Sequence, residues 1–394
     1  MDTLDAYVVL NQLPGIGPLR VAQLLQRYGS PQAILSAPSA ELSRLPGLGG
    51  KLAGVLSGWR DYADPEAERR LAERGGVTIL ACDSPDYPEL LREIHDPPLC
   101  LYCRGSIEAL RRCAHGLAMV GSRRTTLYGT RMAEHLALGA AYAGWPVVSG
   151  LARGIDTVVH DAVLKARGCT VAVLGSGLGQ IYPQENVALA RRIAEAGGAV
   201  ISEFPMDYHP DKRTFPMRNR IISGMTLGTV VIEAGATSGS LITAGQAAEQ
   251  GRQVFAVPGR VDTPQARGCH ALIKDGAKLV ECFEDIAEEF TRLPGLPLET
   301  PATGAAGGVP EAASGTADGA ARRPPPAAGL ELSPLEETLL ASLDTTEVGI
   351  DDLIAAVGAP TAEVLSALLR LEMRRLVRQL PGRRVVRNQP PAGR

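Results

Sequence analysis

Short apolar runs alternate with amphipathic helical stretches from about residue 77 to residue 289. The runs have the length of buried strands, and helical periodicity fills most of the gaps between them. The expected strands are Val77–Ala81, Leu99–Tyr102, Leu117–Val120, Pro146–Ser149, Thr170–Leu174, Ala199–Ser202, Thr229–Ile232 and Gln253–Val257. The expected helices are Arg131–Ala143, Asp156–Arg167, Glu185–Glu195, Arg218–Gly224, Leu241–Gln250 and Cys269–Asp275. This alternation predicts right-handed β-α-β units and a mainly parallel α/β sheet with helices on both faces.

The segment before residue 76 contains the same pattern twice. Leu13–Pro18 and Leu45–Gly49 each carry a Gly-x-Gly turn, and each is followed by an apolar helical stretch. The pattern predicts two helix-hairpin-helix units. Hairpin amides and helix N-termini of this kind can bind DNA phosphates, but the glycines also permit tight helix packing, and both interpretations stay open.

The amino-acid composition changes twice in about the last quarter of the chain. Pro294–Gly329 is rich in Ala, Gly, Pro, Thr and Ser, which is typical of a disordered linker. Three helical patterns and an arginine-rich hairpin then predict a winged helix, a class that binds nucleic acid or protein. The helical patterns are Pro334–Leu343, Ile350–Val357 and Thr361–Glu372, and the hairpin is Arg374–Val386. The expected domains are therefore 1–75, 76–290, a linker over 291–330, and 331–394.

The bulk composition is that of a soluble multidomain protein. The 394 residues carry a net charge of −3, so any nucleic-acid binding requires a local concentration of arginine. No apolar run approaches the ~20 residues that cross a bilayer, and we expect a cytoplasmic protein with no membrane contact. The seven cysteines fit reduced thiols. Cys100 and Cys103, with Cys113 and His115, form only a weak zinc pattern, so we expect no metal.

Glycine-rich polar turns follow the expected strands of the central domain. The carboxyl ends of parallel strands share one edge of a sheet, so these turns should converge on a single cleft. The candidate anion-binding residues of this edge are Gly121, Ser122, Arg123, Arg153, Arg218, Asn219, Arg220, Ser238 and Ser240. Neither a dinucleotide fingerprint nor a P-loop is present at the Gly121 turn. Guanidinium groups, hydroxyls and glycine amides suit phosphate, and the anion is interpreted as a polymer backbone.

Catalytic patterns are sparse. Asp156 stands at the opening of a helix, where a carboxylate usually acts as a cap, and Glu233 ends a strand, where it can accept bonds from loop amides. His160 and His270 have no Ser or Cys partner at motif spacing and are interpreted as packed or surface residues. Tyr182 and Phe215 either stack on bases or belong to the core.

Two uses of the cleft remain open at this point. One is a phosphate-tracking groove for single-stranded nucleic acid, and the other is a small-nucleotide enzyme site. A third possibility is a protein-docking scaffold built on the terminal domains.

An ordered series of motifs narrows these choices. It comprises Gly121-Ser122-Arg123, Ser149–Asp156, Val173–Gly175, Ile181–Asn186, Ser202-Glu203, Phe215–Arg220, Ser238–Ala244 and Val257–Gly259. The series resembles the DNA processing protein A family, also called DprA or Smf. The resemblance implies an extended Rossmann domain that dimerises, binds single-stranded DNA and loads the RecA recombinase on it in natural transformation, without catalysis or a cofactor. It places Arg123, Arg218 and Arg220 in the DNA pocket.

We therefore expect a non-enzymatic mediator that binds the single-stranded DNA backbone, forms a homodimer through its Rossmann domain and presents the strand to RecA. If about four phosphates are neutralised, the logarithm of the binding constant should fall with the logarithm of salt concentration at a slope near −3. The alternative is a nucleotide hydrolase of the phosphoribohydrolase type with Glu233 as its carboxylate, although the Pro-Gly-Gly-x-Gly-Thr turn of those enzymes is absent.

Overall fold

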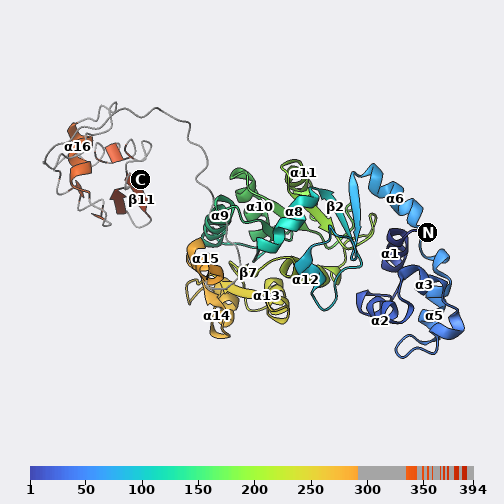
Figure 1. Cartoon of the computed structure of the whole chain (residues 1–394). Helices are drawn as coiled ribbons and strands as arrows, with labels where there is room; N and C mark the ends of the chain where they lie inside the picture. Colours follow the sequence, from blue (N-terminus) through green and yellow to red (C-terminus); the bar gives the residue numbers. More distant parts are fainter. Residues whose placement is uncertain are drawn as a thin grey trace, which may run out of the picture. The chain divides into compact units, whose positions relative to one another are not determined.

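The computed structural model describes residues 1–291 and, further on, residues 334–343, 348–349, 353–354, 357, 364, 367–368, 371, 377–380 and 384–387. The chain divides into two compact units, Met1–Ala306 and Gly307–Arg394 (Figure 1). The predicted linker lies outside the described residues, except for its first residue. Within the described part, no helix combines the length and apolar character needed to cross a bilayer.

The N-terminal segment is entirely helical. Its elements are α1 (Thr3–Gln12), α2 (Pro18–Tyr28), α3 (Pro31–Ser36), α4 (Ser39–Leu42), α5 (Gly49–Ser57) and α6 (Pro65–Arg74). Side-chain caps begin three of these helices: Asp2 accepts from Asp5 N at 2.7 Å, and Ser30 and Asp64 cap α3 and α6. The two predicted hairpins precede α2 and α5. Gly15 and Gly47 adopt φ of +76° and +78° there, a conformation that favours glycine.

A nine-stranded sheet follows, in the order β1-β2-β6-β5-β4-β3-β7-β8-β9. The strands are β1 (Val77–Ala81), β2 (Cys100–Gly105), β3 (Leu117–Val120), β4 (Val147–Ser149), β5 (Thr170–Val173), β6 (Ala199–Ser202), β7 (Gly228–Val231), β8 (Gln253–Ala256) and β9 (Lys278–Leu279). Strands β3 to β9 pair in parallel, whereas β1 and β2 extend the sheet in antiparallel fashion. The predicted mainly parallel sheet is confirmed. Sequence reasoning missed the two-residue strand β9.

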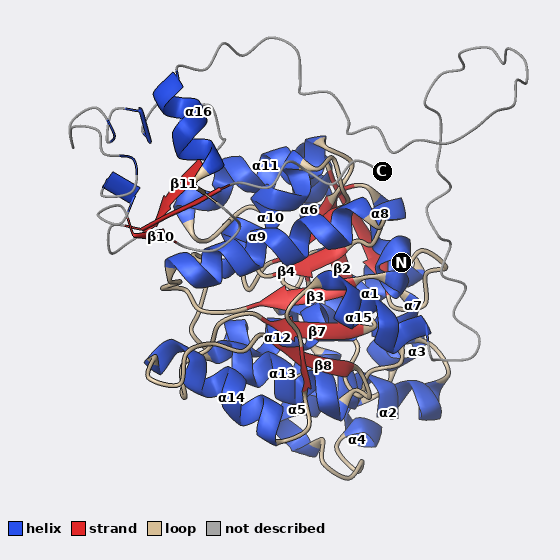
Figure 2. Ribbon diagram, turned by 90° about the vertical axis from the view of Figure 1, so that its left-hand side faces the viewer, coloured by secondary structure: helices blue, strands red, loops and turns tan. Residues whose placement is uncertain are grey.

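Helices cover both faces of this sheet (Figure 2). The helices of the central segment are α7 (Glu89–Arg92), α8 (Ile107–Arg112), α9 (Leu127–Tyr142), α10 (Ile155–Lys165), α11 (Val187–Glu195), α12 (Thr214–Gly224), α13 (Gly239–Glu249), α14 (Arg267–Lys274) and α15 (Phe283–Thr291). Leu117 and Met119 of β3 pack with α9, α10 and α15, and the alternate residues Ala118 and Val120 pack with α12 and α13. The apolar runs are continuous because both faces of each strand are buried.

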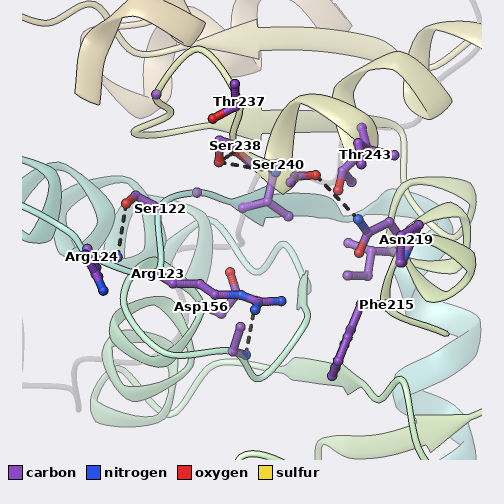
Figure 3. Close-up of a pocket in the computed structure, with 18 of the residues that line it drawn as sticks. Ser122, Arg123, Arg124, Asp156, Phe215, Asn219, Thr237, Ser238, Ser240 and Thr243 are labelled. Carbon is purple, nitrogen blue, oxygen red and sulfur yellow. Dashed lines mark hydrogen bonds between the residues drawn. The ribbon is translucent and has the colours of Figure 1, made fainter. Parts of the chain in front are cut away.

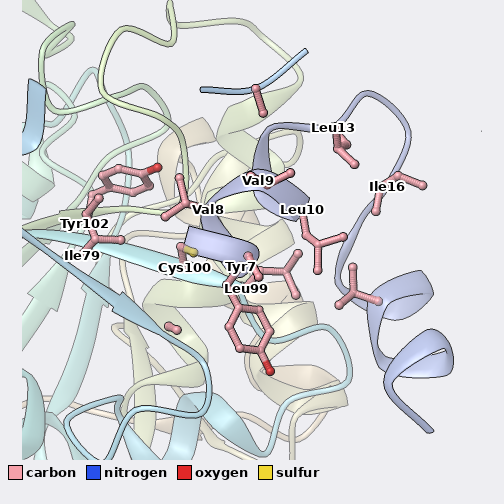
Figure 4. Close-up of a cluster of buried hydrophobic side chains, with 14 of the residues drawn as sticks. Tyr7, Val8, Val9, Leu10, Leu13, Ile16, Ile79, Leu99, Cys100 and Tyr102 are labelled. Atoms are coloured by element: carbon pink, nitrogen blue, oxygen red, sulfur yellow. The ribbon is translucent and has the colours of Figure 1, made fainter. Parts of the chain in front are cut away.

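The N-terminal helices pack against the antiparallel edge of the sheet. Val8, Val9 and Leu10 of α1 share one buried cluster with Ile79 of β1 and Tyr102 of β2 (Figure 4). The two cysteines of β2 lie on opposite faces of the sheet, because Cys100 joins this cluster whereas Cys103 joins that of α8 and α12. These two thiols therefore cannot bind one metal ion together.

The second unit contains α16 (Pro334–Ala341) and a small sheet in the order β10-β12-β11. Strands β11 (Val377–Leu380) and β12 (Arg384–Arg387) pair antiparallel, which is the predicted hairpin. Strand β10 (Val348–Gly349) pairs with β12 and was not predicted. A compact apolar cluster that includes Leu339 and Leu368 holds this unit together.

His160 of α10 is fully buried beneath the sheet. The Thr170 hydroxyl donates its proton to Val147 O at 2.8 Å. The same hydroxyl therefore accepts a hydrogen bond from His160 Nδ1, which lies 2.8 Å away. Nε2 has no partner among the described atoms. Burial lowers the pKa of His160 from 6.5 to about 3, so this side chain stays neutral in the folded protein at moderately acidic pH.

This histidine should make the folded state sensitive to acid. As the pH falls from 6.5 towards 3, His160 gains a proton in the unfolded chain but not in the folded one, so the unfolded state is favoured. We expect the free energy of unfolding to fall with decreasing pH more steeply in the unmodified protein than in His160→Gln. The two slopes should differ by roughly 1.4 kcal/mol per pH unit. Urea titrations between pH 4 and 7 measure both slopes, and parallel slopes would refute this account.

Candidate nucleic-acid interface

A cleft of about 820 Å³ opens at the carboxyl edge of the sheet. The chain runs outwards from β3 through β4, β5 and β6 and returns to β7 on the other side of β3, so the strand order reverses between β3 and β7. Ligands of α/β sheets bind at such a reversal, because neighbouring loops diverge there. The turns after β3, β4 and β7 and the first turns of α12 line the cleft.

The turn after β3 supplies Ser122, Arg123 and Arg124. Gly121 is required where this turn leaves the sheet, because a Cβ there would lie 2.6 Å from Ile155 Cγ1. Arg124 N donates to Ser122 Oγ at 3.1 Å, which tightens the turn. The exposed Arg123 side chain places its guanidinium carbon 5.3 Å from the centre of the Phe215 ring. Arg123 is therefore an accessible cation on the cleft wall, steadied by an aromatic face.

Glu233, which follows β7, fixes this turn from behind. Its backbone oxygen accepts from Ser122 N at 2.7 Å, and its Oε2 accepts from Thr126 N and Thr125 Oγ1, both at 2.9 Å. The side chain is buried at the start of α9, where the helix amides favour a carboxylate. Glu233 does not line the cleft, so it is not placed to act on a molecule held there.

Gly129 of α9 leaves the room that Glu233 occupies. A Cβ at Gly129 would lie 1.9 Å from Glu233 Oε2, whereas a Cβ at Gly245, in the interior of α13, would meet nothing within 4 Å. The two glycines therefore form a matched pair.

We expect Gly129→Ala to lower the free energy of unfolding by about 1–3 kcal/mol, because the carboxylate must move. Gly245→Ala should raise it by about 0.5–1 kcal/mol through helix propensity alone. Denaturant titration of both variants is the measurement, and a stabilising Gly129→Ala would contradict the role given to Glu233.

The turn after β4 is held by a buried carboxylate and a buried guanidinium. Asp156 Oδ2 accepts from Gly150 N at 3.1 Å and from Ala152 N at 3.2 Å, and Arg218 Nη1 donates to Gly150 O and Val173 O. Asp156 thus binds the amides of the preceding turn and is not the helix cap expected from the sequence. Burial raises the pKa of Asp156 and lowers that of Arg218 to about 10.

Arg220 lies outside the cleft, contrary to its predicted place in the DNA pocket. Its guanidinium is buried, and it pairs with Glu203 Oε2 at 2.7 Å and with Asp96 Oδ2 at 2.8 Å. Burial raises the pKa of Glu203, a shift that the Arg220 charge opposes. Arg220 therefore anchors α12 to the loop after β6 and has no free donor face to offer a ligand.

Arg153 also lies outside the group that lines the cleft. It is exposed and pairs with Glu185. The structure brings together the other seven predicted residues, namely Gly121, Ser122, Arg123, Arg218, Asn219, Ser238 and Ser240. Arg218 is only 4% exposed, so it acts mainly as a structural cation in the cleft floor.

Hydroxyl groups of α13 form the opposite wall. Ser238 is the N-cap of this helix, and its Oγ lies 2.8 Å from Ser240 Oγ. Thr237, Ser238 and Ser240 lie across the cleft from Phe215 (Figure 3). The N-terminus of an 11-residue helix and its hydroxyls supply hydrogen-bond donors suited to an anion.

Several lining residues were missed from the sequence. Lys212 and Arg124 add cationic side chains, and Thr237 and Thr243 add hydroxyls. Lys212 belongs to an irregular loop and carries no motif signal, whereas Arg124 stood beside a predicted residue. Tyr182 and Phe215, left open between base stacking and the core, both line the cleft with ring centres 5.9 Å apart.

These features define a Rossmann-like protein with a cationic, hydroxyl-rich cleft at the reversal of its strand order. A family model described as DNA recombination-mediator protein A matches residues 78–291. Models of a SAM-like helix-hairpin-helix tandem and of the DprA winged helix domain match residues 8–55 and 323–383. The chain belongs to the DNA recombination-mediator protein A (DprA/Smf) family, as its motifs predicted.

Individual relatives agree with this assignment. Protein Smf of Synechocystis sp. is 32% identical over 393 residues, which span 97% of this chain and 98% of the relative. DNA processing protein DprA of Bacillus subtilis is 44% identical over 240 residues, 61% of this chain and 76% of its own. The X-ray structure of DNA processing protein A from Streptococcus pneumoniae has a TM-score of 0.60 at 32% identity, covering 73% of this chain and 95% of that chain. The predicted fold class, with its helix-hairpin-helix start and winged-helix end, is confirmed.

Proposed function

We propose that this chain, a DNA recombination mediator by family, binds the backbone of single-stranded DNA in the cleft between the β3 turn and the start of α13. The observation that carries the proposal is the exposed Arg123 guanidinium, which faces a cleft rich in hydroxyls and backbone donors. Such donors bind phosphate oxygens without reading base edges, so binding should depend little on sequence. The proposed contacts are Gly121, Ser122, Arg123, Asn219, Ser238 and Ser240, joined by Arg124 and Lys212.

The aromatic side of the cleft favours a single strand over a duplex. Tyr182 is 42% exposed and Phe215 is half-buried, so each ring has a surface on which an unpaired base can stack. Stacking on aromatic side chains combined with a cationic groove is the usual way to bind single strands without sequence preference. In a duplex the base faces are covered by their neighbours.

The proposed role is binding without catalysis. Among the described residues that line the cleft, Asp156 alone carries a carboxylate. This carboxylate already accepts hydrogen bonds from two backbone amides. Glu233, the residue on which a hydrolase mechanism would depend, is engaged with Thr125 and Thr126 behind the β3 turn. Glu233 lines a separate cavity of about 480 Å³ beside Tyr128 and Pro258, so this geometry gives no support to a nucleotide hydrolase that acts in the cleft described above.

We further propose that the chain acts as a homodimer and loads RecA on the strand that it holds. Both proposals rest on the family and not on a surface of the molecule. Light scattering measures the first, and the rate of RecA filament formation on coated single-stranded DNA, with and without the chain, measures the second.

Salt dependence tests the site directly. Three exposed cations line the cleft, namely Arg123, Arg124 and Lys212, so the expected slope of log K against log salt is about −2 and not the −3 inferred for four phosphates. Arg123→Ala should weaken binding about tenfold or more on every single-stranded sequence and make the slope shallower by about 0.7. Fluorescence anisotropy with labelled oligonucleotides at several salt concentrations measures both.

Arg131→Ala is the matched control, because Arg131 is an exposed arginine of α9 that does not line the cleft. It should leave the affinity within about twofold of the unmodified value, as expected for a screened distant charge. Equal effects of the two substitutions would overturn the site assignment. Release of product from nucleoside monophosphates by the purified chain would instead favour the hydrolase.

A further inference from the structure

The loop between β6 and α12, residues 203–213, builds one wall of the cleft. It carries Lys212 and leads directly to Phe215, and both residues line the cleft. Its outer half, from residue 207 to residue 213, is exposed, whereas Glu203, Phe204 and Met206 are buried. The wall is thus held at its α12 end by that helix and at its β6 end by the contacts of the inner half.

The neighbouring loop after β5 holds part of it. Gly177 N donates to Tyr208 O at 2.8 Å, and Gly179 N donates to Met206 O at 2.9 Å. The close approach requires a glycine, because a Cβ at Gly177 would lie 2.0 Å from Pro205 O. The 203–213 loop is thus hydrogen-bonded to the loop that leads to Tyr182, another residue that lines the cleft.

The N-terminal helices hold the same segment through two polar contacts. Glu68 Oε1 of α6 accepts from Met206 N at 2.7 Å, and Asn11 Nδ2 of α1 donates to Glu203 O at 2.9 Å. Apolar packing of α1 against β1 and β2 fixes these helices to the sheet (Figure 4). Two side chains of the helices are therefore hydrogen-bonded to backbone atoms at the two ends of the stretch 203–206.

Packing alone does not explain why a glutamate occupies position 68, because a buried carboxylate is costly. Glu68 is only 7% exposed, and burial raises its pKa, so its ionised form is disfavoured where it lies. An apolar side chain would fill the space without that desolvation penalty, but it could not accept the Met206 amide. Besides an interaction with the buried Tyr102 hydroxyl, glutamate supplies here the acceptor for the Met206 amide of the cleft wall.

We propose that Glu68 and Asn11 are positioning residues, through which the N-terminal helical domain sets the wall of the cleft for the DNA strand. This inference rests on the proposed function. It gives the helical domain a mechanical part in binding that requires no contact between its hairpins and DNA.

Substitution of Glu68 tests the proposal. We expect Glu68→Ala to weaken binding of a labelled single-stranded oligonucleotide about three- to tenfold in the full-length chain, because the wall loses an anchor. Glu68→Gln should restore the affinity to within about twofold, since an amide oxygen accepts the same hydrogen bond. Glu73→Ala, which removes an exposed glutamate of the same helix, should bind like the unmodified chain.

A double-mutant cycle separates positioning from general damage to the fold. If Glu68 acts through the wall, its loss should matter less in a chain that already lacks the Lys212 cation, so Glu68→Ala and Lys212→Ala should be non-additive. In the Arg124→Ala background, on the β3 side of the cleft, Glu68→Ala should keep its full effect. Additivity in both backgrounds would overturn the proposal.

The remaining outcomes are equally decisive. Unchanged affinity of Glu68→Ala beside a weakened Arg123→Ala overturns the positioning role and leaves the DNA site intact, whereas failure of the unmodified chain to bind overturns the proposed function itself. If Glu68→Ala does not fold, Asn11→Ala removes the second contact at a half-buried side chain and should weaken binding in the same direction. Wild-type affinity of folded Asn11→Ala would then refute the proposal.

Discussion

Two buried guanidinium groups determine where α12 lies, and the cleft depends on that helix. Arg218 donates to carbonyls at the ends of β4 and β5, and Arg220 pairs with Glu203 and Asp96. Burying such charges is costly unless their hydrogen bonds are made, so a helix displaced from these partners would leave them uncompensated. The helix is therefore confined to one position, which places Phe215 and Asn219 in the cleft.

The arginines of this domain consequently have separate tasks. Arg218 and Arg220 stiffen the framework, whereas Arg123 remains accessible on a turn that Glu233 holds from behind. A preorganised turn loses little conformational freedom when a ligand binds, so more of the interaction energy is available for affinity. The buried Arg218 and Arg220 and the accessible Arg123 therefore complement one another, because the first two hold the framework on which the third is displayed.

The N-terminal helical domain contacts the central domain at the antiparallel edge of the sheet. Strands β1 and β2 extend the parallel sheet in the antiparallel sense, and α1 covers the apolar surface that they present. From that position Asn11 and Glu68 reach the segment after β6. The first 75 residues thus pack beside the cleft wall, although their hairpins resemble modules that bind DNA themselves.

The sequence by itself determined the sheet, its carboxyl edge and the family. Apolar runs of strand length, each followed by a glycine-rich turn, require a parallel sheet whose polar turns meet, and seven of the nine predicted residues do line one cleft. Only the tertiary structure decided which arginines are free. Arg218 and Arg220 stand roughly 200° apart on α12 and cannot face the same cleft, and the packing of this helix on the sheet decides which of them lies towards it. Lys212 and Glu68 carried no pattern at all, because their roles come from contacts between segments distant in the chain. Local spacing shows which residues follow a strand, but burial and helix phase, which tertiary packing sets, decide which charges meet a ligand and which are neutralised within the protein.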